Sequence, residues 1–265
     1  MTSRVAIVTG GTRGIGAAVS RMLKNKGYKV AATYAGNAAT AQAFKADTGI
    51  NVYKFDVGDY TACAASVAQI EKDLGPIAVL VNNAGIARDS TMSRLTRDMW
   101  DAVIDNNLGS CFNMSKAVWD GMNTRGFGRI INIGSINGQG GQYGQVNYAA
   151  AKSGIHGFTK ALAQEGAPKG ITVNVVAPGY TDTDMLSIVP PNVLKKIVAK
   201  IPVGRLGRPR ISRAVWSFSS QTIAASSPAR PCRSTAVSIC TDSGISSAHA
   251  AFELALSRTR CVRRA

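Results

Sequence analysis

Short apolar segments recur along the chain, and their composition predicts buried strands. They are rich in β-branched, alanine or aromatic residues and lie at residues 4–9, 28–34, 51–55, 77–81, 128–133 and 171–176. A mixed apolar and polar pattern, typical of helices, occupies residues 17–26, 60–73, a stretch that begins near Thr96, and 148–164. Strands that alternate with helices predict an α/β fold with a doubly wound parallel sheet, in a single domain.

A glycine-rich turn connects the first predicted strand to the first predicted helix. From Gly10 to Gly16 it reads Gly-Gly-Thr-Arg-Gly-Ile-Gly. In this context such glycines predict a dinucleotide site, because Gly10 permits the tight turn and Gly14 and Gly16 allow the pyrophosphate and the helix to approach closely. The free N–H groups at the helix N-terminus would then bind the phosphates. A glycine turn without a ligand is the alternative.

The end of the second predicted strand bears on the choice of nicotinamide cofactor. An Asp or Glu at this point usually binds the ribose of a cofactor without the 2′-phosphate, whereas residues 34–37 here read Tyr-Ala-Gly-Asn. Arg13 in the glycine-rich turn is available for the extra phosphate of NADPH. Both features predict NADPH; a solvated Arg13 without a ligand is the alternative. Asp56 ends the third strand, where an acid could meet the adenine side.

Three side chains further along the chain could together transfer a proton. Tyr148 and Lys152 are four residues apart, so a helix that begins at Tyr148 places them on one face. A phenol titrates near pH 10, and an adjacent ammonium favours the phenolate and lowers that pKa. Ser135 follows the fifth predicted strand and could hold a substrate carbonyl oxygen. Taken alone, Tyr148 and Lys152 could equally be a surface pair, because this spacing is common.

Small and amide residues follow the fourth predicted strand and enter the next helix. Asn83, Ala84 and Gly85 leave room for a ligand at the switch point of the sheet. Asn106 and Asn107 disfavour the helix locally, so we expect one of them to have a hydrogen-bonding role.

Composition narrows the class of protein. No apolar run is long enough to span a bilayer and the N-terminus has no signal pattern, so we expect a cytoplasmic protein without a membrane partner. The five cysteines show neither metal-ligand nor disulfide spacing, and two isolated histidines are too few for a metal site, so no metal is predicted. The net charge of +16 fits an anionic partner such as a nucleotide, CoA, an acidic carrier protein or nucleic acid.

With these residues assembled, the chain resembles the short-chain dehydrogenase/reductase family from residue 4 to residue 209. The matching motifs are Thr9-Gly10-x-x-x-Gly14-x-Gly16, Asn82-Asn83-Ala84-Gly85, Asn107, Ser135, Tyr148-x-x-x-Lys152 and Pro178-Gly179. The resemblance implies a Rossmann fold and an NADPH-dependent oxidoreductase with a catalytic tetrad. Tyr148 would donate the proton, Ser135 would polarise the carbonyl, Lys152 would lower the pKa of Tyr148 and hold the nicotinamide ribose, and Asn107 would support a water. The implied cofactor contacts come from Gly10, Thr12, Arg13, Gly14, Ile15, Gly16, Tyr34, Asp56, Val57, Asn83, Ala84, Gly85, Tyr148, Lys152, Pro178, Gly179 and Thr181.

Within the family, the loops resemble those of the acetoacetyl-CoA reductases of polyhydroxybutyrate synthesis, on residues 135–139, 141–145 and 178–180. This implies reduction of a 3-oxoacyl thioester, acetoacetyl-CoA to (R)-3-hydroxybutyryl-CoA. The implied acyl-CoA pocket is lined by Asp89, Gln142, Tyr143, Gln145 and Tyr180, each of which could instead be an ordinary polar loop residue. Gly140 departs from the pattern, because these relatives carry lysine there, and this weakens the implied CoA contact. The alternative is a 3-oxoacyl-acyl-carrier-protein reductase, which shares the tetrad and nearly the same loops.

Residues 210–265 do not continue the pattern. They contain eight arginines, two acids, three cysteines and one glycine, but no lysine. Family members continue past residues 207–209 with a helix, a strand and a glycine-rich end, and one nucleotide inserted after the Pro209 codon could restore such a sequence. We therefore predict a family domain at residues 1–209 and a frameshifted or disordered tail at residues 210–265, with the final strand of the sheet lost.

Three further expectations follow from this tail. A homotetramer is expected only of a chain with an intact C-terminus. The chain could also be the inactive product of a damaged gene. A genuine arginine-rich tail that binds nucleic acid is the remaining alternative, and we do not expect it, because Trp216, Phe218 and Phe252 alone could stack on bases.

Overall fold

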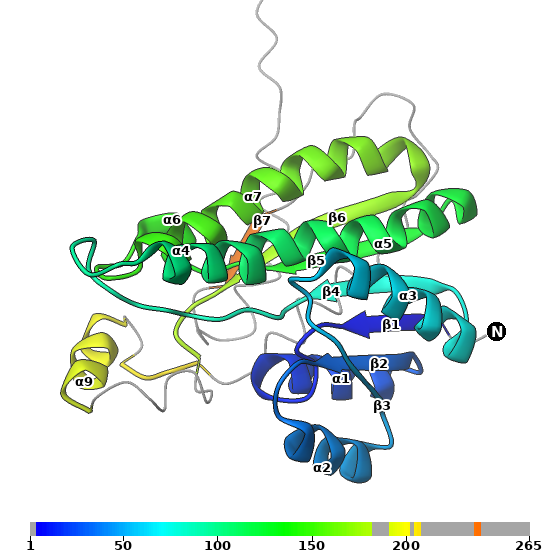
Figure 1. Cartoon of the computed structure of the whole chain (residues 1–265), viewed down its shortest axis with the longest axis horizontal. Coiled ribbons are helices and arrows are strands. Elements are labelled where there is room, and N and C mark those ends of the chain that lie inside the picture. The colour runs from blue at the N-terminus through cyan, green and yellow to red at the C-terminus, as the bar shows by residue number, and fades with distance from the viewer. Residues whose placement is uncertain (1–3, 182–190, 202–203, 208–235, 240–265) are drawn as a thin grey trace, which may run out of the picture.

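The computed structural model describes residues 4–181, 191–201, 204–207 and 236–239 (Figure 1). Its strands form one parallel sheet in the order β3-β2-β1-β4-β5-β6-β7. They are β1 (Val5–Val8), β2 (Lys29–Tyr34), β3 (Asn51–Lys54), β4 (Ile77–Asn82), β5 (Gly128–Ile133), β6 (Ile171–Pro178) and β7 (Ala236–Ile239). The strand order reverses between β1 and β4, which places a ligand-binding crevice at the carboxyl ends of these two strands.

Helices cover both faces of the sheet (Figure 1). They are α1 (Gly14–Asn25), α2 (Ala38–Thr48), α3 (Tyr60–Leu74), α4 (Arg97–Ile104), α5 (Ser110–Arg125), α6 (Asn137–Gly140), α7 (Val146–Gly166) and α9 (Pro191–Lys200), with a π-helical turn η1 (Asp105–Gly109) and a 3-10 turn η2 (Ala167–Lys169). One apolar core joins the sheet to α3, α5 and α7, and a second joins its other face to α1 and α2. The α/β fold with a doubly wound parallel sheet is therefore confirmed.

The chain also forms a helix that the apolar pattern did not predict. Helix α2 buries only Ala41 and Phe44, so it carries almost no amphipathic signal. Its ends are nevertheless well defined. The side chain of Asn37 accepts a hydrogen bond from the Thr40 N–H at 2.9 Å, and Gly49 ends the helix with φ 64°.

The expectation that the final strand is lost is wrong for this structure. Strand β7 pairs with β6 in parallel register, from Val175 opposite Ala236 to Pro178 opposite Ile239. The open edge of β6 offers unpaired backbone groups, and residues 236–239 read Ala-Val-Ser-Ile, a sequence with strand propensity. Most of the predicted tail, residues 210–235 and 240–265, lies outside the described residues.

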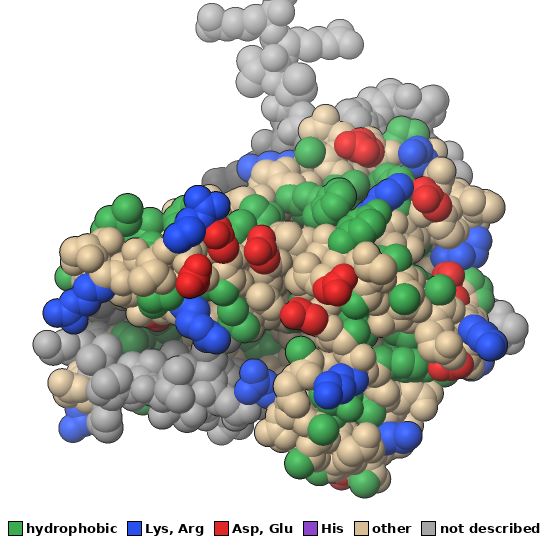
Figure 2. Space-filling model, in the orientation of Figure 1, with side chains coloured by type: hydrophobic (Ala, Val, Ile, Leu, Met, Phe, Trp, Pro, Cys, Tyr) green, Lys and Arg blue, Asp and Glu red, His purple; other side chains and the backbone are tan. Residues whose placement is uncertain are grey.

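Basic and acidic side chains are interspersed on the face shown in Figure 2. Two exposed ion pairs lie on α4 and α5, Arg97 with Asp101 at 2.6 Å and Lys116 with Asp120 at 3.6 Å, and in each the partners are one helical turn apart. All four side chains are well exposed, so each pair adds little to stability. The mixture means that the described part of this face carries no large field of one sign.

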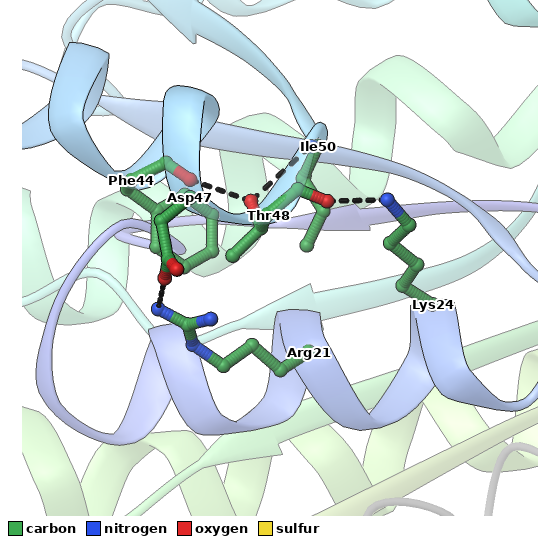
Figure 3. Close-up of polar contacts among 6 residues, drawn as sticks. All are labelled: Arg21, Lys24, Phe44, Asp47, Thr48 and Ile50. Carbon is green, nitrogen blue, oxygen red and sulfur yellow. Dashed lines mark hydrogen bonds and ion pairs between the residues drawn. The ribbon is translucent and has the colours of Figure 1, made fainter.

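Polar contacts between α1 and α2 fix the region beyond the end of β2 (Figure 3). Arg21 donates to Asp47 at 2.5 Å, and Lys24 donates to the backbone carbonyl of Thr48. The Thr48 hydroxyl donates to the Phe44 carbonyl at 2.6 Å and accepts from the Ile50 N–H at 3.2 Å. The start of β3 is therefore tied to α1, at the amino ends of the strands and opposite the carboxyl ends at which a dinucleotide is expected.

Candidate active site

The glycine-rich turn packs directly on the loop that follows β4. The Thr9 hydroxyl accepts hydrogen bonds from the N–H groups of Asn83 and Ala84, both at 2.9 Å. In return, the Asn83 side chain donates to the carbonyls of Thr9 at 2.9 Å and Gly10 at 3.2 Å. These bonds join the ends of β1 and β4, so the predicted pyrophosphate turn and the loop at residues 83–85 form one rigid unit.

Two glycines of this turn have conformational or steric requirements that other residues would not meet. Gly14 has φ 52°, a left-handed conformation that opens α1. A Cβ atom at Gly16 would lie 2.1 Å from the Gly10 carbonyl oxygen and 2.6 Å from Asn83 Nδ2. The turn is therefore a tight cradle of backbone groups at a helix N-terminus, the geometry that suits a dinucleotide phosphate.

The other predicted cofactor residues lie at the carboxyl ends of neighbouring strands. Arg13 is exposed and occupies the N-cap position of α1, and Tyr34 is half-buried at the end of β2. Asp56 accepts from the Gly58 N–H at 2.8 Å, and the Pro178 carbonyl accepts from the Ile136 N–H at 3.0 Å. The remaining members of the set lie along the same edge of the sheet, at Gly10, Thr12, Ile15, Val57, Ala84, Gly85, Gly179 and Thr181.

The structure brings the predicted proton-transfer residues together. Ser135 follows β5, and a side-chain hydrogen bond joins it to Tyr148 on α7. The Lys152 ammonium, one turn further along α7, lies 5.7 Å from the centre of the Tyr148 ring. It donates to the Ile133 carbonyl at 2.8 Å, which anchors α7 to the end of β5.

Burial dominates the electrostatics of this group. It raises the pKa of Tyr148 above its usual value of 10.0; the Ser135 hydrogen bond acts in the opposite direction and the Asp89 carboxylate adds to the rise. Burial likewise lowers the pKa of Lys152 to about 8. The Tyr148 pKa is therefore raised, whereas Lys152 was expected to lower it, because burial outweighs the other contributions.

Asn107 lies on the π-helical turn η1, where the paired asparagines were expected to disturb the helix. Its side chain is fully buried and donates to the carbonyls of Ile86 at 2.9 Å and Val103 at 2.8 Å. Its Oδ1 atom is buried and has no hydrogen-bond partner within the described part of the chain. A Cβ atom at Gly85 would lie 2.4 Å from Asn107 Oδ1 and 3.7 Å from Lys152 Nζ, so both atoms border the space beside Gly85. A water there would satisfy the free acceptor.

Side-chain amides connect the loops around this group. Gln145 donates to Asp89 at 2.7 Å and accepts from Asn137 at 2.9 Å, and the Asn137 N–H donates to the Ser135 hydroxyl at 3.2 Å. The Tyr180 hydroxyl donates to Gln142 at 3.3 Å. Four of the predicted substrate residues are therefore hydrogen-bonded in pairs, Asp89 with Gln145 and Gln142 with Tyr180.

One predicted substrate residue is largely exposed, and two asparagines at the starts of α6 and α7 were not predicted. Tyr143 is 86% exposed. Asn137 bridges Ser135 to Gln145, and Asn147 donates to the carbonyls of Arg88 at 3.0 Å and Met99 at 3.2 Å. Adjacency to Ser135 and Tyr148 is the sequence signal that could have identified both.

The family model for short chain dehydrogenases matches residues 4–193. The chain belongs to this family. It is therefore an oxidoreductase that acts on CH–OH groups. Over most of its length the chain is similar to an acetoacetyl-CoA reductase of Shinella zoogloeoides, with 61% identity over 220 residues. It is also similar to one of Cupriavidus necator, with 46% identity over 229 residues. The two alignments cover 82% and 84% of this chain and 91% and 93% of those proteins. A 3-oxoacyl-acyl-carrier-protein reductase of Vibrio harveyi is 42% identical over 223 residues, 83% of this chain and 91% of that protein.

Two kinds of feature are absent from the residues that the structure describes. None of their helices combines the length and the low polarity needed to cross a bilayer. No group of three His, Cys, Asp or Glu side chains in this part of the chain could hold a metal ion.

Proposed function

We propose that the protein reduces acetoacetyl-CoA to (R)-3-hydroxybutyryl-CoA and uses NADPH as the hydride donor. The observation that carries this proposal is the high identity, 61%, 59% and 56%, to curated acetoacetyl-CoA reductases across nearly their full length. The acyl-carrier-protein reductase is less similar, at 42% over a comparable length.

The residues of the glycine-rich turn fit a dinucleotide. A side chain at Gly16 would fill the space beside Gly10, so the cradle depends on the absence of a Cβ atom there. Arg13 is exposed at the start of α1, and no acid ends β2, which favours a cofactor with a 2′-phosphate. NADPH, when bound, supplies the hydride that the carbonyl carbon accepts.

Tyr148 acts as the proton donor to the carbonyl oxygen in this proposal. Its pKa is raised by burial, so the phenol is fully protonated at neutral pH, the form that a reduction requires. Ser135 hydrogen-bonds to Tyr148 and can donate to the same carbonyl oxygen, which polarises the carbonyl. As the oxygen takes the Tyr148 proton, the Ser135 hydrogen bond, which acts to lower the Tyr148 pKa, would stabilise the phenolate that remains.

The thioester part of the substrate would lie against the loops that carry Gln142, Gln145 and Tyr180. The bonds of Gln145 to Asp89 and Asn137 hold these loops in a fixed arrangement next to Ser135. A fixed arrangement supports catalysis because the carbonyl must stay aligned with both the hydride and the proton donor.

The test is NADPH oxidation by the purified protein. We expect turnover with acetoacetyl-CoA at a higher kcat/KM than with an acetoacetyl thioester of acyl carrier protein, and a lower rate with NADH at the same concentration. Preference for the carrier-protein thioester would instead assign the protein to fatty acid synthesis. No oxidation with either thioester would refute the proposal.

A further inference from the structure

A network of buried polar side chains lies on one face of the sheet next to the active site, and of its members only Asn82 belongs to a motif described above. Asn82 on β4 donates to Asn132 on β5 at 2.8 Å and to Ser115 on α5 at 3.3 Å. Asn132 donates in turn to the hydroxyl of Thr159 on α7 at 2.9 Å. All four side chains are at most 4% exposed.

The position of this network of polar side chains follows from the register of the strands. Asn82 and Asn132 are direct neighbours in the parallel pairing of β4 and β5, so their side chains point to the same face of the sheet. Leu80 and Ile130, two residues earlier on each strand, pack in the core formed with α3, α5 and α7. The two amides therefore face α5 and α7, where Ser115 and Thr159 receive their hydrogen bonds.

Two consecutive residues of β5 thus hold α7. The Ile133 carbonyl accepts from Lys152, and the Asn132 side chain donates to Thr159, which is seven residues further along the same helix. Residues seven apart lie on the same face of a helix, two turns from each other. The Lys152 side chain is long and flexible, whereas Asn132 and Thr159 are short, so the second bond limits sliding of α7 along β5 more strictly.

We propose that Asn132 and Thr159 are positioning residues for catalysis, which act by fixing the axial position of α7 on β5. This inference rests on the proposed function only for its turnover readout. Ser135 follows β5, whereas Tyr148 and Lys152 are on α7, so any slip of the helix changes the distance from the phenol to Ser135. A misplacement of about 1 Å in an active site can reduce the rate by roughly 10²-fold.

A contribution to stability alone does not explain this network of side chains well. Asn82 Oδ1 is buried without a hydrogen-bond partner among the described residues, which carries a desolvation penalty. Apolar side chains of the same size would fill this space without that penalty, but they would not select one register between strand and helix. A site in which Ser135 follows β5 and Tyr148 and Lys152 lie on α7 needs such a selection of register.

The decisive variant is Thr159→Val, which keeps the shape of the side chain and removes the acceptor for Asn132. We expect kcat with acetoacetyl-CoA to fall by roughly 10- to 10²-fold with KM for NADPH nearly unchanged. Thr159→Ser, which keeps the hydroxyl, should restore kcat to within about threefold of the wild-type value. If Thr159→Val does not fold, Thr159→Ala, which also lacks the hydroxyl and suits a helix, takes its place with the same expectation.

Thr172→Val is a matched control. Thr172 on β6 is also a buried threonine, but its hydroxyl has no hydrogen-bond partner in the described residues, so the same substitution there removes no bond. We expect wild-type kcat from this control. Wild-type kcat in a folded Thr159→Val protein, or an equal loss in the control, would overturn the proposal.

A second readout does not depend on turnover. The Tyr148 phenol can be titrated by NMR with ring-labelled tyrosine, its signal being the one absent from Tyr148→Phe. We expect the Tyr148 pKa to move in Thr159→Val and to stay in Thr172→Val. If wild type oxidises no NADPH but this shift is present, the positioning role stands and the proposed function fails; an unchanged Tyr148 pKa in Thr159→Val overturns the positioning role.

Discussion

Replacement of Gly16 by alanine tests whether the glycine-rich turn is a cofactor cradle. A Cβ atom at this position would lie 2.1 Å from the Gly10 carbonyl oxygen, 2.6 Å from Asn83 Nδ2 and 2.8 Å from the Gly10 carbonyl carbon. Since real Cβ contacts are essentially never below 3.0 Å, α1 and the turn must separate by about 0.9 Å, the difference between 3.0 and 2.1 Å. The atoms in the way are mainly backbone, so rotation of a side chain cannot relieve the clash.

Two effects on folding oppose each other in this variant. Alanine within α1 gains about 1 kcal/mol of helix propensity over glycine. Overpacking against a rigid neighbour costs about 1–3 kcal/mol. We therefore expect a net loss of roughly 0–2 kcal/mol in the free energy of unfolding, which leaves a folded protein to assay. The larger effect is on the cofactor, because a displacement of about 1 Å at the phosphate site lowers kcat/KM for NADPH by roughly 10²-fold.

Fluorescence titration with NADPH and steady-state kinetics measure the expected loss. Gly157→Ala is the matched control, because Gly157 lies within α7 and nothing lies within 4 Å of an added Cβ. It should gain about 1 kcal/mol of stability and leave NADPH binding unchanged. If Gly16→Ala bound NADPH as tightly as the wild type, the turn would not be the phosphate cradle.

Three further predictions concern catalysis, substrate affinity and pH. Tyr148→Phe should lose turnover and keep NADPH binding; unchanged turnover would contradict the proton-donor role. Gly140 is exposed with nothing within 4 Å of an added Cβ, so Gly140→Lys should be tolerated and should lower KM for acetoacetyl-CoA several-fold, whereas an unchanged KM would mean that CoA does not pass this position. The pKa of Lys152 is about 8 when folded and 10.5 in its usual state, so the folded protein binds fewer protons between these values. The free energy of unfolding of the wild type should therefore rise, relative to Lys152→Met, as pH increases from about 8 to 10.5. Denaturant melts at several pH values measure the difference, and a constant difference would show that the ammonium is not desolvated.

The sheet and its glycine turn could be predicted because their signals are local. Six of the strands follow apolar runs that start and end within about two residues of the predicted bounds. The strand before the turn at Gly10–Gly16 and the helix after it indicate that the turn is a dinucleotide site. Asn106 and Asn107 were also informative, since each donates to a carbonyl four residues earlier, Ala102 or Val103, and the helix widens into a π-turn there.

The polar connections of the site could not be predicted, because they join residues that are distant in the sequence. Asn82 and Asn132 are 50 residues apart, and only the parallel register of β4 and β5 makes them neighbours. The pKa of Tyr148 was predicted to be lowered, whereas burial raises it. The spacing to Lys152 indicates proximity, but the depth of burial, which decides the sign of the pKa shift, depends on the whole fold.

The open edge of β6 explains how a segment beyond the predicted frameshift can still pair with the sheet. All eight residues of β6 are buried, so this strand needs a neighbour, and backbone pairing accepts any segment with adequate strand propensity. The pairing of residues 236–239 therefore follows from the edge that β6 offers and does not require a C-terminus selected for this fold.

Insertion of one nucleotide after the Pro209 codon tests this idea directly. We expect the repaired chain to place a longer strand on the same edge, to form a tetramer in sedimentation experiments, and to bind NADPH more tightly than the 265-residue chain. The physical reason is that a strand selected for this fold adds apolar packing to the backbone pairing that closes the sheet. A tetramer with full reductase activity from the 265-residue chain would show that the tail completes the fold as it stands, and that the frame was never shifted.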